Sequence, residues 1–173
     1  MSTIRHLHVR TRSVYLWSGF LLAVCAALLI PYVLEHGGRP SLRLPHASLL
    51  VLLPAFYVHE LLHVIGLRAF GGLPARDVGM RMSWRHLMLH LDVQVPVEAR
   101  RLRWATRLPL VLLGILPTLV GGVADWRLVY YFGIAMILGC GGDIAVLRVL
   151  RVVPAGTPVR LTAAWSRADE SHP

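Results

Sequence analysis

Two histidines and a glutamate with the spacing of a metal site lie in the first half of the chain. Residues 59–63 read HELLH, an HExxH motif inside an apolar run at 47–70. On a helix, residues four apart share one face, so His59 and His63 can bind one zinc ion together while Glu60 sits beside it. Zinc hydrolases need neutral imidazole ligands, an open position for water and a carboxylate that accepts the water's proton. The motif therefore predicts a hydrolytic zinc centre with Glu60 as its base.

The apolar setting of the motif favours a functional role over a structural one. Two imidazoles and a carboxylate in a membrane-length apolar segment cost several kcal/mol to insert, and such groups usually mark a function. The structural alternative is a pair of histidines that neighbouring helices satisfy by hydrogen bonding. That alternative leaves Glu60 without a role.

The composition indicates a membrane protein. The 173 residues are 55% hydrophobic and their mean hydropathy is +0.59, which is typical of a chain that packs within a bilayer. Four segments are long enough to cross it, at about 14–34, 48–67, 108–124 and 128–147. The first follows a basic leader at residues 1–13. With about twenty apolar residues it is too long for the core of a signal peptide, so we expect an anchor.

The distribution of arginine predicts the orientation of these spans. The sequence has no lysine, and with the N-terminus inside, fifteen of its 18 basic residues fall in cytoplasmic segments. Only Arg39, Arg43 and Arg127 fall outside, so the positive-inside rule places both termini in the cytoplasm. The net charge of +9 is then assigned to topology and to contacts with anionic lipid in the bilayer. No nucleic-acid partner is expected.

Two stretches between the second and third predicted spans alternate apolar with polar residues. This period of two predicts a small cytoplasmic β-hairpin over about 77–95. Within the hairpin, His90 is a candidate contact for a substrate or for the developing oxyanion. Its predicted polar face comprises Arg81, Ser83, His90, Asp92 and Gln94. After the hairpin, residues 97–107 are expected to form a basic amphipathic segment at the membrane interface.

A catalytic zinc usually has three protein ligands, so the HExxH motif needs a partner. Among the carboxylates outside the motif, only Asp143 falls within a predicted span. At about 1.5 Å per residue, His59 and Asp143 lie about 17 Å and about 22 Å along their helices from the outer end, which are similar depths. Asp143 is therefore the favoured third ligand, with Cys140 and His90 as alternatives. Its structural alternative is an ion pair with an arginine such as Arg148.

Three features together resemble a known family: the HELLH motif in the second span, a hairpin-like stretch leading to a proline, and the run GCGGDI at 139–144 in the fourth span. They resemble the small bacterial membrane proteins of the "putative zincin peptidase" family and, more loosely, are similar to intramembrane metalloproteases of the site-2 protease type. The resemblance covers most of residues 14–150. It implies a bacterial cell membrane protein with zinc on His59, His63 and Asp143 and with Glu60 as catalytic base.

These features predict an all-α membrane protein with about four transmembrane helices and one small cytoplasmic β-hairpin. Residues 1–150 are expected to form a membrane-embedded, zincin-like domain, and residues 151–173 a loosely ordered cytoplasmic tail. The expected function is that of a zinc metallopeptidase that hydrolyses peptide bonds of a membrane protein or peptide substrate. The alternatives are a non-enzymatic protein that binds or transports a metal, and a hydrolase acting on a lipid or prenylated peptide. A transporter would be expected to repeat polar residues along a path, whereas here they cluster at one depth.

Overall fold

The protein is mostly helical and carries two small sheets. The computed structural model describes residues 4–35, 46–70, 72–83, 88–93 and 95–163. The helices are α1 (Thr11–Glu35), α2 (His46–Ala69), α3 (Ala99–Pro109), α4 (Leu116–Val123), α5 (Arg127–Gly139) and α6 (Gly141–Leu150). A 3-10 turn, η1 (Ala75–Asp77), precedes β2, and a π-helical segment, η2 (Leu110–Ile115), joins α3 to α4. The strands are β1 (Arg5–Val9), β2 (Val78–Ser83), β3 (Met88–Val93), β4 (Val97–Glu98) and β5 (Pro158–Ala163).

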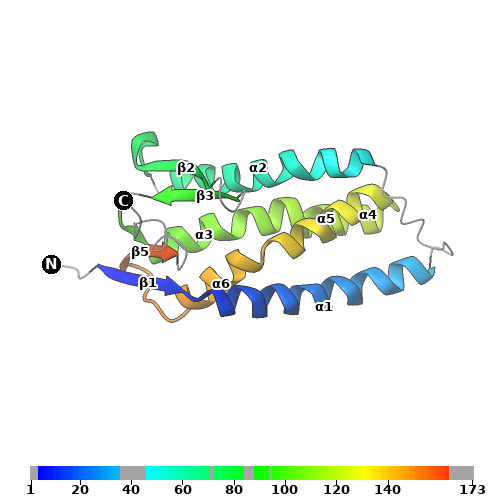
Figure 1. Cartoon of the computed structure of the whole chain (residues 1–173), viewed down its shortest axis with the longest axis horizontal. Helices are drawn as coiled ribbons and strands as arrows, with labels where there is room; N and C mark the ends of the chain where they lie inside the picture. The colour runs from blue at the N-terminus through cyan, green and yellow to red at the C-terminus, as the bar shows by residue number, and fades with distance from the viewer. Residues whose placement is uncertain (1–3, 36–45, 71, 84–87, 94, 164–173) are drawn as a thin grey trace.

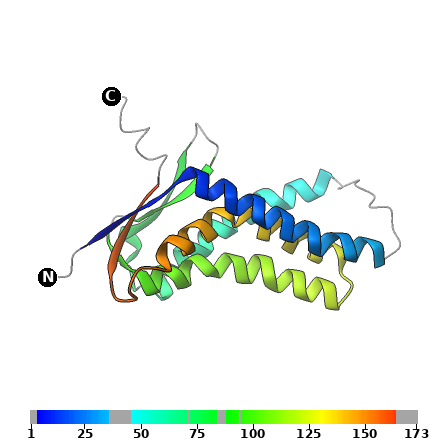
Figure 2. The ribbon, with the colours of Figure 1, turned by 90° about the horizontal axis from the view of Figure 1, so that it is seen from below.

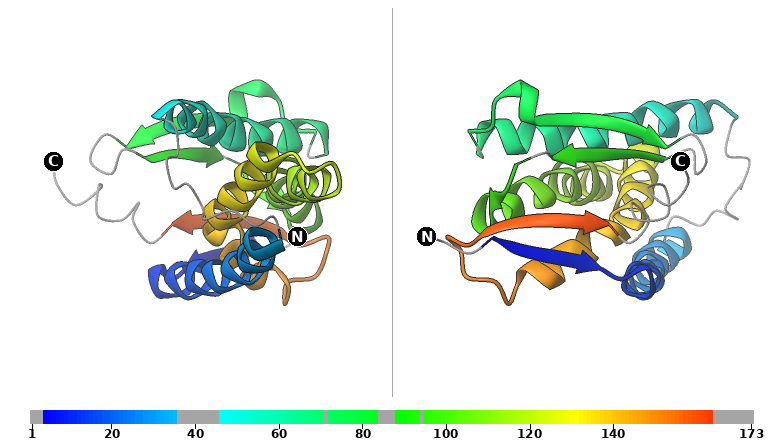
Figure 3. Two further views of the ribbon diagram at one scale, coloured as in Figure 1. Left: turned by 90° about the vertical axis from the view of Figure 1, so that its right-hand side faces the viewer. Right: turned by 60° about the vertical axis from the view of Figure 1, so that its left-hand side comes forward.

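The helices lie side by side along the long axis of the molecule, and the strands gather at one end (Figure 1). Seen from below, α5 and α6 lie between α1 and the helix formed by α3 and α4 (Figure 2). The hairpin of β2 and β3 contacts α2, and the pair of β1 and β5 lies at the same end of the helices (Figure 3). One end of the molecule is thus helical, and the other is capped by strands.

Two helices are long and apolar enough to cross a membrane in the part of the chain that the structure describes. They are Arg12–Glu35 and the continuous helix Ala99–Val123, which α3, η2 and α4 form together. The pair Arg127–Gly139 and Gly141–Leu150 adds a third if it counts as one broken span, bent by 50°. These helices are consistent with a membrane protein.

The surface of α1 supports this interpretation. Tyr15, Leu16 and Leu34 are 73%, 65% and 75% exposed, and no charged residue lies between Arg12 and Glu35. Further exposed apolar side chains, among them Phe20, Leu22 and Ile30, occur between them. Soluble monomers rarely expose large apolar patches. The hydrocarbon core of a bilayer matches both its chemistry and its length.

The predicted spans coincide with these helices, but the bounds of the third and fourth differ. The predicted span at 14–34 lies within α1, and the one at 48–67 lies within α2, whose crossing of the bilayer stays a prediction. The third was expected to begin at 108, but its helix already begins at Ala99. The fourth, expected as a single span at 128–147, is broken at Cys140, where the backbone leaves the helical region with ψ of 14°.

One face of the segment before the third span packs against the rest of the protein. Every third or fourth residue of α3 is buried, and this face packs against α2 and α6. Most of the predicted amphipathic segment at 97–107 is thus the first half of the long helix, and its place at the membrane interface stays a prediction. The buried residues of α3 are Ala99, Leu102, Ala105, Thr106 and Pro109.

The predicted β-hairpin is present. Strands β2 and β3 pair antiparallel from Val78↔Val93 to Ser83↔Met88. Of its predicted polar face, Gln94 lies outside the described residues, as do the side chains of Arg81, Ser83, His90 and Asp92.

The second sheet joins segments near the two ends of the chain, and it corrects the all-α prediction. Strand β5 lies in the centre, parallel to β1 with Arg5 opposite Val159, and antiparallel to β4 with Val97 opposite Val159. The prediction of a loosely ordered tail was wrong for residues 158–163, and residues 5–9 of the basic leader form a strand that was not predicted. Both strands are short, and a parallel partner about 150 residues away leaves no local signal, because parallel strands need no common turn.

Residues of both sheets pack against the helices in one apolar core. Its members come from α2, α3, α6, the turn after α6 and strands β2, β4 and β5, so the strands are packed against the helical layer. The buried members are Val64, Leu67, Val78, Val97, Ala99, Leu102, Ala105, Leu150, Val153 and Val159. Val64, the residue after His63, belongs to this core, so the core packs α2 with α3 and α6 close to the motif.

Candidate metal centre

Three of the predicted site residues converge between α2 and α6. His59 Nε2 lies 3.0 Å from Asp143 Oδ2, and His63 Nε2 lies 3.1 Å from Asp143 Oδ1. The histidine side chains are 7% and 8% exposed and the aspartate side chain is 15% exposed. The two imidazoles share one face of α2 because they are four residues apart. The structure thus brings together two histidines and the carboxylate that was favoured from its depth.

A backbone carbonyl determines the proton position on His63. The Nδ1 atom of His63 lies 3.1 Å from the carbonyl oxygen of Ala105, in α3. Because a carbonyl can only accept, Nδ1 must carry the proton, and Nε2 of the neutral ring then presents a lone pair. Such a hydrogen bond to the second ring nitrogen is the usual way in which a metal-binding histidine is oriented.

Pro109 explains why this carbonyl is available. In an α-helix the carbonyl of residue 105 accepts from the N–H of residue 109, and proline has no N–H. The N–H of the next residue, Leu110, donates to the carbonyl of Arg107 instead. The carbonyl of Ala105 is therefore free of its ordinary helical partner, and His63 takes that place.

The donor set fits a zinc ion. Two lone pairs, on His63 Nε2 and on the Asp143 carboxylate, face each other at 3.1 Å and repel unless a cation or a proton lies between them. Ligands of a tetrahedral zinc, each about 2.0–2.2 Å from the ion, lie about 3.3 Å from one another. The two observed separations from the histidines to Asp143, one to each carboxylate oxygen, are close to this value. Within the described residues, Asp143 Oδ2 is buried and makes no aligned hydrogen bond. Nitrogen and oxygen donors with an uncommitted carboxylate oxygen are the ligands that zinc prefers.

The break in the fourth span positions Asp143. Cys140 separates α5 from α6, so Asp143 falls in the first turn of α6, where the helix dipole stabilises a carboxylate. The glycines around the break allow neighbouring helices to approach closely. At Gly139 an added Cβ would lie 3.1 Å from the Phe56 ring of α2, whereas Gly141 packs against Ser18 of α1.

The other candidate residues have separate positions. Glu60 offers a carboxylate oxygen within 4.8 Å of donor atoms of His59 and His63, as a base beside the metal requires. Cys140 is buried near His59 and Asp143, but its thiol donates to the carbonyl of Met136 at 3.2 Å. His90 lies in β3 opposite Arg81, and its side chain is outside the described part of the chain.

Two contributors to the site were not predicted from the sequence. One is the Ala105 carbonyl, which only the proline four residues later could have indicated. The other is Gly66, one turn after His63, where an added Cβ would lie 2.8 Å from Ala105 Cα. A side chain there would separate α2 from α3 and lengthen the hydrogen bond to His63, so the glycine permits the close approach that this bond requires.

Replacing Pro109 tests the role of the free carbonyl. In Pro109→Ala the restored N–H can donate to Ala105 O in competition with His63. We expect zinc affinity to fall by about tenfold, the lower end of the range for losing an outer-shell partner of a ligand. Titration against a chromophoric chelator measures it. Pro117→Ala, in α4, is the control and should bind zinc as the parent does; equal affinities for all three proteins would mean that Pro109 plays no part.

An HExxH pair on one helix is the zinc-binding motif of the metallopeptidases called zincins, and here a carboxylate from a second helix lies beside it. Comparison with known families agrees with this class. The chain belongs to the family described as "Putative zincin peptidase", whose sequence model matches residues 52–158 and so includes the motif and Asp143. No curated protein and no solved structure matches the chain.

Proposed function

We propose that this protein is a membrane-embedded zinc endopeptidase with His59, His63 and Asp143 as metal ligands and Glu60 as catalytic base. The observation that carries the proposal is the meeting of three donors from two helices at 3.0–3.1 Å. The family description supports the metallopeptidase class, and the apolar helices support a membrane location.

Each residue of the site has a separate role in the proposed reaction. Zinc bound at this site supplies a Lewis acid that polarises the scissile carbonyl. Glu60 accepts a proton from the attacking water and delivers it to the leaving amine nitrogen. The hydrogen bond from His63 Nδ1 to Ala105 O holds one imidazole in a fixed orientation and keeps its Nε2 free as a ligand. Because the histidines are buried, bulk water has little access to their ring nitrogens and does not compete with them for the metal.

The hairpin offers a place for an extended substrate. In the described part of the chain, β2 and β3 pair only with each other, so each strand has an open edge. A membrane-spanning substrate must unwind before it can be cut, and an unwound segment can pair with such an edge by strand addition. We assign the hairpin to substrate binding, with His90 as a candidate contact.

The distribution of buried polar groups supports an enzyme over a transporter. A transport path needs polar groups at successive depths. Apart from Asp143, the buried polar or charged residues within the described segments are His59, His63, Thr106 and Thr118. Both threonines bond to carbonyls of their own helix four residues back, so they line no separate path.

Metal analysis and peptide cleavage test the proposal directly. The purified full-length protein should hold about one zinc per chain and should cleave some members of a set of membrane-spanning peptides. A chelator should stop cleavage, and added zinc should restore it. Protein that binds no zinc, or cleavage that is unaffected by the chelator, would contradict the proposal.

We further propose four crossings with both termini in the cytoplasm of a bacterial cell. Strands β1 and β5 pair with each other, and β2 and β5 share one core, so these three segments lie on one side of the bilayer. The chain must therefore cross an even number of times between β1 and β2, which supports α2 as a span beside α1. A reporter fused after Pro173 should behave as cytoplasmic; an external C-terminus would mean that the number of crossings is wrong.

A further inference from the structure

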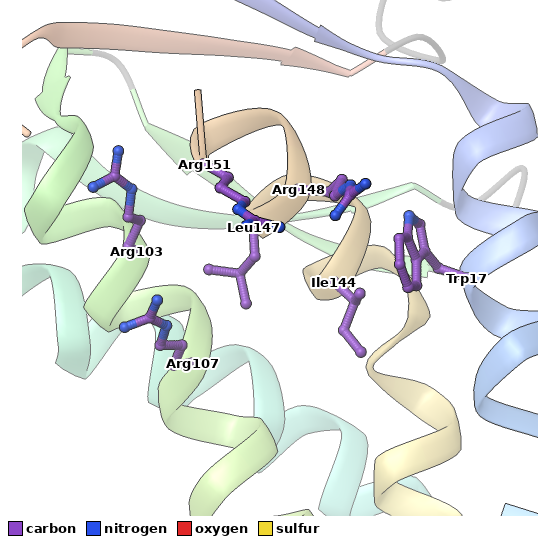
Figure 4. A pocket seen from close by; sticks show the side chains of 7 residues that line it. All are labelled: Trp17, Arg103, Arg107, Ile144, Leu147, Arg148 and Arg151. Carbon is purple, nitrogen blue, oxygen red and sulfur yellow. The ribbon is translucent and has the colours of Figure 1, made fainter. Parts of the chain in front are cut away.

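Four arginines surround a cavity that is separate from the metal centre. The cavity has a volume of about 380 Å³ and lies between α1, α3 and α6 (Figure 4). Its volume is within the range of small-ligand sites, about 300–1,000 Å³. We call it the arginine pocket; its lining residues are Trp17, Arg103, Arg107, Ile144, Leu147, Arg148 and Arg151.

The spacing of the four arginines places their positive charges around the same cavity. Arg103 and Arg107 are four residues apart on α3. Arg148 lies on α6, and Arg151, three residues later, directly follows α6 with a helical backbone, so each pair shares one face. The lining contains no acidic residue, and among the described residues none of the four has a carboxylate partner. Four like charges around one cavity repel one another, and a bound anion would remove that cost.

Some of the arginines are already held in position by the chain. Arg103 donates to the carbonyls of Leu150 and Val153, while its Nε is buried without a partner among the described residues. The guanidinium of Arg148 lies 5.8 Å from the centre of the Trp17 ring (Figure 4). That of Arg107 lies 5.4 Å from the Trp104 ring. Guanidinium groups fixed in this way lose less freedom when they bind a phosphate in the bidentate manner that arginine favours.

The residues around the arginine pocket favour a lipid headgroup as the anion. Tryptophan and arginine side chains are typical of the level at which lipid headgroups lie, and Trp17 and Trp104 both flank pocket arginines. Ile144 and Leu147 provide an apolar wall beside the charges, as a molecule with both a phosphate and acyl chains requires. We propose that the arginine pocket binds the phosphate headgroup of an anionic phospholipid and so bridges α3 and α6.

Lipid binding by the full-length protein tests this inference independently of peptidase activity. Native mass spectrometry from a neutral detergent would count bound phosphatidylglycerol against phosphatidylcholine. We expect preferential binding of one phosphatidylglycerol. In the double variant Arg107→Gln/Arg151→Gln the affinity should fall by about 30-fold, from the usual contribution of two arginines at an anionic surface. These two side chains are exposed and make no hydrogen bond to the backbone among the described contacts, so the fold should survive their replacement.

The control removes the same charge elsewhere. Arg76→Gln/Arg100→Gln lies outside the pocket and should retain the preference for phosphatidylglycerol. Equal loss in both double variants would reduce the effect to general surface charge and overturn the inference. So would equal binding of the two lipids by the parent, or displacement of phosphatidylglycerol by inorganic phosphate or by an acidic peptide, which would assign the pocket to another anion.

Discussion

The variant Glu60→Gln should keep its zinc and lose its activity. Glutamine preserves the size of the side chain but cannot accept the proton of the attacking water, and general-base catalysis contributes about 10²–10⁴-fold to rate. We expect cleavage to fall by at least about 100-fold, whereas zinc content stays at the parent value because Glu60 is not among the proposed ligands. Zinc analysis and single-turnover peptide cleavage on one preparation measure both quantities.

The matched control is Glu98→Gln, which removes a carboxylate that is paired with Arg101 on the surface. It should leave both zinc and cleavage near the parent values, since exposed ion pairs contribute little. Loss of zinc from Glu60→Gln would show that Glu60 is itself a ligand, as its place near both histidines makes geometrically feasible. Unchanged cleavage would remove it from the mechanism altogether.

Replacing Asp143 should have the second large effect, this time on the metal. Asp143→Ala leaves two histidines facing a cavity, and we expect zinc affinity to fall by more than the factor of about 10–100 that follows loss of an outer-shell partner. Cleavage should be lost with the zinc. Asp143→Glu should retain some metal but little activity, because a displaced carboxylate misplaces the reacting groups. Chelator competition and cleavage assays, with membrane insertion checked separately, measure these effects.

Two controls accompany this prediction. Asp77→Ala removes an aspartate whose ion-pair partner Arg76 is 86% exposed, and it should change neither zinc nor cleavage. Cys140→Ala should retain zinc, since the thiol already donates to Met136 O. If Asp143→Ala keeps full zinc while Cys140→Ala loses it, the third ligand is the cysteine and the assignment of Asp143 is wrong.

The sequence contained the parts of the site that depend on spacing along one helix. Residues four apart must share a face, so the geometry of His59 and His63 followed from the motif. The depth of Asp143 was also predictable from helical rise, whereas the break of the span at Cys140 was not. A run of glycines indicates a possible break but not its angle, which depends on packing against α1 and α2.

Backbone contributions and distant pairings were less predictable. The Ala105 carbonyl has no side-chain signature, and it matters only because Pro109 frees it and Gly66 lets α2 approach it. The alternation at 77–95 gave the hairpin correctly because its two strands are neighbours in sequence. The strands at 5–9 and 158–163 are individually short, and their pairing depends on the helices that bring the two ends of the chain together.

X-ray absorption at the zinc edge of the zinc-loaded protein tests the central claim most directly, because it reports the atoms bound to the metal. We predict a first shell of nitrogen and oxygen only, at about 2.0–2.2 Å, with the outer-shell scattering of two imidazole rings. That shell should lose an oxygen in Asp143→Ala and remain the same in Cys140→Ala. A sulfur scatterer at about 2.3 Å, or a shell without two imidazoles, would contradict a centre built from His59, His63 and Asp143.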